Sequence, residues 1–360
     1  MRLYIHIPFC ASKCGYCAFR SVVGQEGLFE SYVRALCEDI ESCLSRLKHK
    51  RARVELGSIF FGGGTPNLLP ARFYRPIFER IHAHASLSPT CEITLESNVN
   101  LISRAWCKEL RALGANRLSI GIQSFDKGKL ALLEREHSAR ESERGVEIAH
   151  QAGFDNLSCD LIIGSALDSH ALIESDIARA SALPLKHISV YSLSLDSGSR
   201  FASEGREALL AENEEAQCYF ARECLARHGF AQYEVSNYER GARCAHNLGY
   251  WQGEEYLGVG ASAVGRIGRA RTRAHSSLQE YIKAPSARHI ERLSKEDMRL
   301  ERVMLGLRCD VGVQLDSVNL AETSLRILLD EGKCRLRGGY LVANELFLSD
   351  EITLWLLGRE

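Results

Sequence analysis

Three cysteines within eight residues, in the run Cys10-Ala-Ser-Lys-Cys14-Gly-Tyr-Cys17, constrain this chain more than any other feature. Their spacing, C-x3-C-x2-C, directly follows a strand-like apolar stretch over residues 3–9. Iron–sulfur clusters are usually held by four thiolates, one to each iron of a cubane. Three close thiolates without a nearby fourth therefore predict a [4Fe-4S] cluster with one iron open to a ligand, much as a catalytic metal site keeps one position for substrate.

Two other interpretations of this loop stay open. A structural zinc site needs a fourth Cys or His, usually from a second C-x2-C pair, and the sequence contains no second pair. His6 completes a zinc site only if it turns out of its strand toward the loop. The remaining interpretation is a set of unligated thiols.

The other cysteines indicate a reducing compartment. The chain has 13 cysteines, an odd number, and their spacing suggests no disulfide framework. The chain starts directly in a strand-like stretch, so we expect no secretory signal or transit peptide and mostly reduced thiols in the cytoplasm. Five cysteines fall in helix-like segments, where we expect small buried hydrophobes: Cys37, Cys43, Cys107, Cys218 and Cys224.

Composition is that of an ordinary globular protein, with 45% hydrophobic and 25% charged residues among 360. A net charge of −1 gives no support to nucleic-acid binding, which needs a basic face. No apolar run is long enough to span a bilayer, so no transmembrane segment is expected, and transient membrane association stays open.

Short apolar runs alternate with segments of helical period from residue 3 to about residue 195. Stretches such as 28–47, 71–84 and 103–113 are long enough to be crossover helices. Six strand-then-helix units predict a parallel sheet covered by helices, hence a partial (β/α)6 TIM-type barrel rather than a closed eight-stranded one. The expected strands are 3–7, 58–61, 92–96, 117–122, 157–163 and 187–193.

Ligand sites in such folds collect at the carboxyl ends of the strands. In this chain, polar and glycine residues follow each predicted strand. A triple glycine lets the backbone approach a ligand closely, and the neighbouring polar side chains suit an aminoacyl ligand that carries a ribose. The strand-end groups are the cysteine loop, Gly62-Gly63-Gly64-Thr65-Pro66, Glu96-Ser-Asn98, Gln123, Asp160 and Tyr191-Ser-Leu-Ser194.

After residue 195 the pattern changes. We expect a long helix over 204–228, a strand over 230–235, and a Gly-rich segment over 258–265. Helices over 295–308, 320–330 and 345–357, with a hairpin over 334–343 that turns at Gly338-Gly339, resemble a winged-helix module. Its mixed charge favours an interaction or lid role over DNA binding. The predicted units are residues 1–200, an α+β extension over 201–285, and residues 286–360, with the last boundary near Pro285.

The cysteine loop and its strand-end partners resemble those of radical S-adenosylmethionine proteins. Longer motifs resemble the oxygen-independent coproporphyrinogen III oxidase family over nearly the whole chain. They are Tyr4-Ile-His-Ile-Pro-Phe-Cys10, Phe60-Phe-Gly-Gly-Gly-Thr-Pro66, Arg117-Leu-Ser-Ile-Gly-Ile-Gln-Ser-Phe125, Tyr233-Glu-Val-Ser-Asn237, Cys244 through Trp251 and Tyr256-Leu-Gly-Val-Gly260.

Two departures separate the branches of that family. The decarboxylating oxidase has a fourth cysteine two residues after the third and a long segment before the loop. Here Phe19 holds that position and nine residues precede Cys10. Both features resemble the heme chaperone branch.

The resemblance implies that Tyr4, Gly63, Gly64, Thr65 and Glu96 contact S-adenosylmethionine. Three more residues match positions that line a second S-adenosylmethionine site in the oxidase: Gln123, Arg135 and Asp160. Alternatively, Arg135 belongs to a surface helix. Two family positions are altered, because Val99 replaces a proline and Ser165-Ala-Leu167 replaces a Leu-Pro-Gly-type turn beside the ligand ends of the strands.

The heme chaperone branch also shares a His-Asn-x-x-Tyr-Trp signature associated with heme binding, matched here by His246, Asn247, Tyr250 and Trp251. A histidine can ligate heme iron axially, and aromatic rings can pack on the macrocycle. Alternatively, His246 and Asn247 hydrogen-bond a turn while Tyr250 and Trp251 fill the core.

The resemblance therefore implies a heme chaperone that binds heme, a [4Fe-4S] cluster and S-adenosylmethionine and transfers heme to acceptor proteins. A flavodoxin or ferredoxin is a further candidate partner, as electron donor. Two alternatives stay open: a radical oxidase acting on coproporphyrinogen III or a related tetrapyrrole, and a radical enzyme acting on another substrate. Whether the chain is an enzyme is left undecided.

Overall fold

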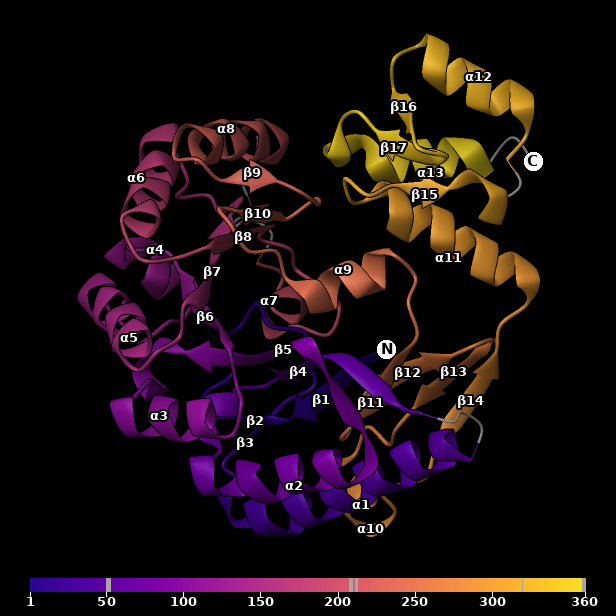
Figure 1. Cartoon of the computed structure of the whole chain (residues 1–360). Helices are drawn as coiled ribbons and strands as arrows, with labels where there is room; N and C mark the ends of the chain where they lie inside the picture. The colour runs from indigo at the N-terminus through magenta and orange to yellow at the C-terminus, as the bar shows by residue number, and fades with distance from the viewer. Residues whose placement is uncertain (50–52, 207–209, 211–212, 319, 358–360) are drawn as a thin grey trace.

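The computed structural model describes residues 1–49, 53–206, 210, 213–318 and 320–357, and its centre is a curved sheet with helices around its outer face (Figure 1). Six parallel strands lie side by side in chain order. Each overlaps one of the six predicted strands, so the predicted parallel sheet is confirmed. The six are β1 (Arg2–Ile7), β4 (Glu55–Gly63), β5 (Ser86–Asn98), β6 (Arg117–Gln123), β7 (Asn156–Ile163) and β8 (His187–Ser192).

Each connection between these strands contains a helix, as is usual for a crossover between parallel strands. The three stretches predicted to be crossover helices correspond to the first three long helices of the fold. The helices of this layer are α1 (Phe29–Lys48), α2 (Tyr74–His84), α3 (Arg104–Ala112), α4 (Lys127–Leu132), α5 (Ala139–Gln151) and α6 (His170–Ser181).

The period of two along each strand gives the sheet two different faces. On β1, Leu3, Ile5 and Ile7 are fully buried in the main core, which they share with residues of the helix layer. Tyr4 and His6 alternate with them and therefore point to the inner, concave side. The inner side of the sheet carries polar groups, and this is where the candidate sites lie.

The six strands form a partial barrel that stays open between its first and last strands. In the twelve-stranded sheet, β1 has β4 and β11 (Tyr256–Val259) as neighbours, and β8 has β7 and β10 (Asn237–Glu239). Among the described residues, β1 and β8 do not pair with each other. The predicted partial barrel is therefore confirmed.

The Gly-rich segment 258–265 adds strands that its composition does not indicate. β11 pairs in parallel with β1, and β12 (Val264–Ile267) returns beside it. A Cβ on Gly258 would lie 2.1 Å from the carbonyl oxygen of Val264, so this close return requires glycine. The same edge continues with β13 (Ala270–Arg273) and β14 (His289–Arg292), and the helix α10 (Leu278–Lys283) connects those two strands.

Two sequence predictions after residue 195 are corrected. The helix expected over 204–228 begins only at Glu214, as α8 (Glu214–Arg227), and α7 (Arg200–Ser203) is a separate turn. Gly205 follows α7 with a φ of +64°, which ends a helix; residues 207–209 and 211–212 of the predicted helix lie outside the described residues. The strand expected over 230–235 covers only β9 (Ala231–Gln232), because Glu234 leaves the sheet to bridge Cys309.

The C-terminal module has its own core of buried side chains, including Val303, Leu328, Leu341 and Leu356. Its predicted helices and its hairpin are confirmed, and a short strand completes a three-stranded sheet. The elements are α11 (Lys295–Leu307), β15 (Val313–Gln314), α12 (Glu322–Asp330), β16 (Cys334–Arg337), β17 (Tyr340–Ala343) and α13 (Ser349–Leu357). In Figure 1 this module sits at one side of the barrel, next to α9 (Ala245–Trp251). The unit boundaries near residues 200 and 285 stay predictions.

All 13 cysteines are free thiols. The five predicted to lie in helices do so, and Cys37, Cys107 and Cys224 are buried, whereas Cys43 and Cys218 are half-buried.

Candidate functional site

The cysteine loop is fixed at both ends by short backbone pairings. β2 (Phe9–Cys10) pairs in parallel with β3 (Val22–Val23), and the amide of Val22 donates to the carbonyl of Pro8 at 2.7 Å. The Thr65 hydroxyl donates to the sulfur of Cys10 at 3.4 Å. These contacts hold the first cysteine directly above the end of β1.

One cavity of about 400 Å³ lies at the carboxyl ends of the six strands. Its wall includes the three cysteines and all but one of the residues predicted to contact S-adenosylmethionine. The residues brought together in this way are Cys10, Cys14, Cys17, Gly63, Gly64, Thr65, Glu96, Gln123, Arg135 and Asp160. The expectation that these residues lie together at the carboxyl ends of the strands therefore agrees with the structure.

Tyr4 lies deeper along the inner face of the sheet. Its hydroxyl is 3.1 Å from Nδ1 of His6, and its ring stacks on Phe60 with 6.2 Å between ring centroids. The Glu96 carboxylate adds to the effect of burial in raising the pKa of Tyr4, so the two side chains are near each other although Tyr4 sits below the cavity wall.

The glycine turn after β4 is shaped by close backbone contacts. The amide of Gly64 donates to the carbonyl of Ile7 at 2.8 Å, and a Cβ on Gly64 would lie 2.7 Å from the carbonyl oxygen of Phe9. Gly63 has a φ of +114°, and its amide donates to Oε2 of Glu96 at 3.1 Å. Both positions therefore need glycine, and the turn lies against the segment that leads into the cysteine loop.

Two carboxyl groups share the inner wall of the cavity. Burial, reinforced by the nearby Asp160 carboxylate, raises the pKa of Glu96 to about 7. Burial also raises the pKa of Asp160, and the Ser119 hydroxyl donates to Asp160 Oδ1 at 3.4 Å. Glu96 therefore exchanges its proton near neutral pH, as groups in functional sites often do.

Gln123 and Arg135 line the same cavity. Gln123 has a φ of +69°, and its buried Oε1 has no hydrogen-bond partner among the described residues. Arg135 lies in the connection between α4 and α5, not on a surface helix as the alternative held. Its guanidinium donates to the carbonyl of Gly121 at 2.9 Å, to Oδ1 of Asn98, and to the sulfur of Cys14 at 3.7 Å.

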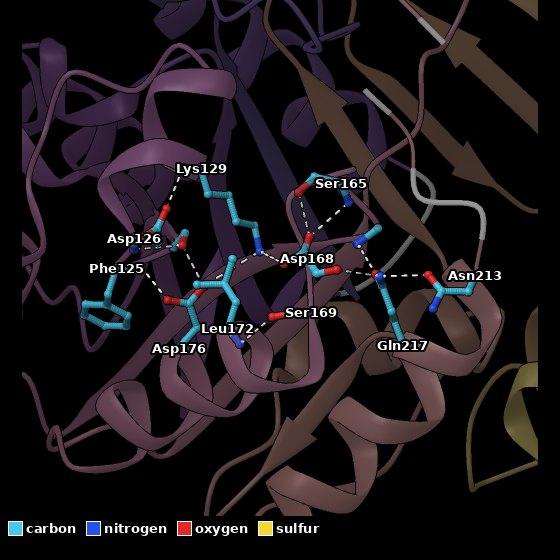
Figure 2. Close-up of polar contacts among 12 residues, drawn as sticks. Phe125, Asp126, Lys129, Ser165, Asp168, Ser169, Leu172, Asp176, Asn213 and Gln217 are labelled. Carbon is cyan, nitrogen blue, oxygen red and sulfur yellow. Dashed lines mark hydrogen bonds and ion pairs between the residues drawn. The ribbon is translucent and has the colours of Figure 1, made fainter. Parts of the chain in front are cut away.

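A buried ion-pair network, which sequence reasoning missed, supports the loops after β6 and β7 (Figure 2). Nζ of Lys129 lies 2.6 Å from Asp168 and 3.7 Å from Asp176, and the lysine side chain is fully buried. Asp168 also accepts from the amide and hydroxyl of Ser165 at 2.9 and 2.7 Å, while Asp176 accepts from Ser124 at 2.6 Å. Asp168 thus stabilises the altered Ser165-Ala-Leu167 turn through its hydrogen bonds with Ser165. Its ion pair with Lys129 connects this turn to α4, which follows the loop that carries Gln123.

His6 is committed to the backbone of the cysteine loop. Its Nε2 lies 2.9 Å from the carbonyl oxygen of Arg20, at the loop's far end. Within the described ranges, no three or more His, Cys, Asp or Glu side chains converge on one point as a single metal ion requires. A cubane takes each thiolate on a different iron, so it does not require this convergence.

Phe19, the residue at the oxidase's fourth-cysteine position, lines the mouth of the cavity with 69% of its surface exposed. Tyr191 lines the same cavity and is 42% exposed. The cavity therefore opens between aromatic side chains and leads down to the thiols and carboxyl groups.

The His-Asn-x-x-Tyr-Trp motif forms α9, a short helix that packs on β4. His246 is only 1% exposed, with Nδ1 at 2.8 Å from the Ser58 hydroxyl and Nε2 at 3.1 Å from the Tyr250 hydroxyl. Burial, with the cations Arg2 and Arg117 nearby, lowers the pKa of His246 to about 3. The imidazole is therefore neutral, and both of its nitrogens have partners inside the protein.

The first turn of α9 is capped from the sheet. The Glu92 carboxylate accepts from the amides of Ala245 and His246 at 3.0 and 3.1 Å, and from the thiol of Cys244 at 3.6 Å. Asn247, Tyr250 and Trp251 are half-buried, and Arg308 of the C-terminal module lies 5.7 Å from the centroid of the Trp251 ring. In this conformation His246 is packed inside the protein, whereas Tyr250 and Trp251 are only half-buried.

The motif and the cavity lie at different depths of one interior. Ser58 and Glu92 pair with each other near the middle of β4 and β5, whereas Gly63 and Glu96 stand near the ends of these strands. The rings of Tyr4, Phe60 and His246 form one cluster, with centroids 6.2 Å apart for Tyr4 and Phe60, 5.0 Å for Phe60 and His246, and 6.5 Å for Tyr4 and His246. This cluster connects the motif to the inner face of the sheet below the cavity.

Comparisons with known proteins agree with this arrangement. The Radical SAM superfamily matches residues 4–166. The chain is 33% identical over 373 residues to a heme chaperone HemW from Synechocystis, covering 97% of this chain and 89% of the relative. It is 33% identical over 321 residues to heme chaperone HemW from Lactococcus lactis, covering 87% and 83%. The relative from Escherichia coli, also named heme chaperone HemW, is 32% identical over 271 residues, covering 74% and 70%.

Among solved structures, coproporphyrinogen III oxidase (HemN) from Escherichia coli, a radical SAM enzyme, superposes with a TM-score of 0.83. The match covers 99% of this chain and 89% of that chain at 21% sequence identity, so it establishes a shared fold. Within the described part of the chain, no helix has the length and apolar character needed to cross a membrane.

Proposed function

The chain belongs to the HemW family of heme chaperones, and we propose that it binds heme, a [4Fe-4S] cluster and S-adenosylmethionine and passes heme to acceptor proteins in the cytoplasm. The observation that carries the proposal is the identity of 33% over 97% of the chain to a relative of that name. Phe19 at the oxidase's fourth-cysteine position supports a chaperone over a decarboxylase.

The donor set of the cavity fits the cluster and the nucleotide. Cys10, Cys14 and Cys17 line one wall, and polar groups of the glycine turn and of Glu96 face the same space. The unpartnered Oε1 of Gln123 is a buried acceptor that a ligand donor would satisfy. When bound, the cluster would supply an electron for cleavage of S-adenosylmethionine, or would hold it uncleaved.

The protein's own groups orient the nucleotide and set its protonation environment. Glu96 lines the cavity, and the Gly63 amide orients its carboxylate through Oε2, so we propose that this group accepts from a ribose hydroxyl or an ammonium. Arg135, held by the carbonyl of Gly121, places a cation beside Cys14 and partly offsets the negative charge of a thiolate-bound cluster. A flavodoxin or ferredoxin would be a suitable electron donor.

Heme is proposed to bind at the motif of His246, Asn247, Tyr250 and Trp251. Because both nitrogens of His246 are engaged by Ser58 and Tyr250, iron ligation requires α9 to release the imidazole. The structure therefore supports a closed form of the motif, which a macrocycle would bind only after that release. Transfer to an acceptor would be favoured by the return of His246 to Ser58.

Parallel assays on one preparation test the proposal. The protein is reconstituted with iron and sulfide without oxygen, and heme binding is followed by absorbance. Heme transfer to a heme-free acceptor protein and decarboxylation of coproporphyrinogen III are measured on the same sample. We expect binding and transfer without decarboxylation. Turnover to protoporphyrinogen would instead assign the chain to the oxidase reaction.

A further inference from the structure

The segments that follow the first and last strands of the barrel meet across its open side. β1 leads into the cysteine loop and β8 leads into α7, and these two strands are not neighbours in the described sheet. The amide of Phe201 in α7 donates to the carbonyl of Gly15 at 2.9 Å. This backbone contact therefore spans the gap that the strands leave open.

The side chain of Phe201 packs so closely on residue 15 that this position must be a glycine. The Phe201 ring is fully buried, and a Cβ on Gly15 would lie 1.9 Å from one of its ring carbons. The ring therefore covers the middle of the loop, between Cys14 and Cys17, at van der Waals distance.

Glu134 binds the backbone amide of Gly15, the residue whose carbonyl accepts from Phe201. Its carboxylate accepts from the amide of Gly15 at 2.8 Å and pairs with the guanidinium of Arg200, whose Nη2 lies 2.6 Å from Oε1. Glu134 has a φ of +52°, a conformation uncommon for residues other than glycine that persists where surrounding contacts enforce it. Both backbone polar groups of Gly15 are thus used, one by Glu134 and one by Phe201.

We propose that Glu134, Arg200 and Phe201 form a clasp that holds Cys14-Gly15 across the open side of the barrel and so retains the cluster. The inference rests on the cluster assigned under the proposed function. The three are positioning residues: Glu134 and Phe201 contact the loop, Arg200 holds Glu134, and none of the three lines the cavity. Without the clasp, the middle of the loop would move away from Arg135 and the two outer cysteines.

Arg200→Met removes the ion pair with Glu134, together with the local pair that Arg200 forms with Glu204 at 2.8 Å, and keeps most of the side chain's bulk. Arg179→Met is a matched control on the outer helices, since each arginine pairs with a glutamate and lies over a phenylalanine ring. Nη2 of Arg179 lies 2.7 Å from Glu143, and its guanidinium carbon lies 5.0 Å from the centroid of Phe125, against 5.5 Å for Arg200 and Phe201. The side-chain exposures are 41% and 47%.

The first readout is iron release from the reconstituted protein to a chelator without oxygen. We expect Arg200→Met to release iron about threefold to fivefold faster than the unmodified protein, the ratio that a partly exposed ion pair supports. Arg200→Lys should restore a large part of the retention, and Arg179→Met should release iron at the original rate. Phe201→Ala should release iron faster than Arg200→Met does.

The second readout is amide hydrogen exchange over residues 14–17 in the cluster-free protein, with the thermal midpoint measured alongside. Faster exchange there in Arg200→Met, at an unchanged midpoint, supports the clasp. Equal exchange and equal iron release in Arg200→Met and Arg179→Met would overturn it. If the unmodified protein takes up no cluster, the proposed function fails at its cofactor, and the exchange measurement still decides whether the clasp exists.

Discussion

The Ser58 hydroxyl lies 2.8 Å from Nδ1 of His246 and fastens the motif helix α9 to the sheet. The same arrangement recurs at His187, whose Nδ1 lies 2.7 Å from Ser158 and whose Nε2 lies 2.8 Å from the Tyr233 hydroxyl. Both histidines are buried, and burial lowers the pKa of each. One pair holds the predicted heme motif, and the other holds β7 to β8 and to the segment before α9.

Ser58→Ala should raise heme affinity about fivefold, because a closed form held by one hydrogen bond worth about 1 kcal/mol reduces apparent affinity by that factor. His246→Ala should lower heme affinity and leave iron content unchanged. Ser158→Ala is the matched control, because it removes the same kind of serine–histidine contact at His187. Heme titration by absorbance measures all three variants.

Opposite effects of Ser58→Ala and His246→Ala identify His246 as a ligand that α9 must release. Unchanged binding in His246→Ala would rule out this histidine as an axial ligand. Equal affinities for Ser58→Ala and Ser158→Ala would show that the contact with Ser58 does not limit heme binding.

Binding of S-adenosylmethionine should strengthen as pH rises from 6 to 8. The pKa of Glu96 is raised to about 7 by burial and by Asp160, so its carboxylate form, which accepts from ligand donors, increases over this range. Glu96→Gln should bind more weakly at pH 8 and lose most of the pH dependence. Equilibrium dialysis of the reconstituted protein at several pH values measures the effect, and a dependence retained in Glu96→Gln would assign it to another group.

The same carboxyl group should make the ligand-free protein less stable at high pH. Its folded pKa lies above the value of about 4.3 for an unfolded glutamate. Its stabilising contribution is therefore complete below the unfolded pKa and is lost as pH rises through about 7. Burial raises the pKa of Glu234 to about 7 as well, so Glu96→Gln should flatten only part of the decline in unfolding free energy between pH 5 and 8, measured with urea.

Lys129→Met should cost about 3–5 kcal/mol of unfolding free energy, because it leaves the buried carboxylates of Asp168 and Asp176 without their cation. The double variant Lys129→Met with Asp168→Asn should recover part of that loss. Lys283→Met, at an exposed pair with Glu280, is the control and should cost less than about 1 kcal/mol. Urea unfolding compares them, and equal losses at Lys129 and Lys283 would contradict a buried network.

Phe19→Ser should leave iron content and stability nearly unchanged, with a stability change within about 0.5 kcal/mol. The reason is that Phe19 is 69% exposed at the mouth of the cavity. Cys17→Ser, at the last cysteine of the loop, should lose bound iron. Iron analysis after anaerobic reconstitution compares the two, and a loss of iron in Phe19→Ser would mean that this position takes part in holding the cluster.

The sequence by itself determined the parallel sheet and placed most of the predicted ligand-contacting residues at the cavity, Tyr4 excepted. Short apolar runs such as 117–122 and 157–163 have the length of buried strands, and the carboxyl ends of parallel strands meet at one edge. The position of Glu96, Gln123 and Asp160 at or near strand ends was therefore enough to predict that they lie at one cavity. The helix 295–308 and the hairpin around Gly338-Gly339 followed in the same way, from local period and turn residues.

Only the tertiary structure decided what those residues do to one another. Whether the His246 imidazole is hydrogen-bonded depends on Ser58, which lies 188 positions away. The position of Gly15 depends on its contacts with Glu134 and Phe201. The pairing of β11 with β1 and the ion pairs of the buried Lys129 likewise depend on residues far apart in the sequence. A period or a turn signal arises from neighbours within a few residues, whereas these contacts arise from the close packing of segments that the chain brings together only once the barrel has formed.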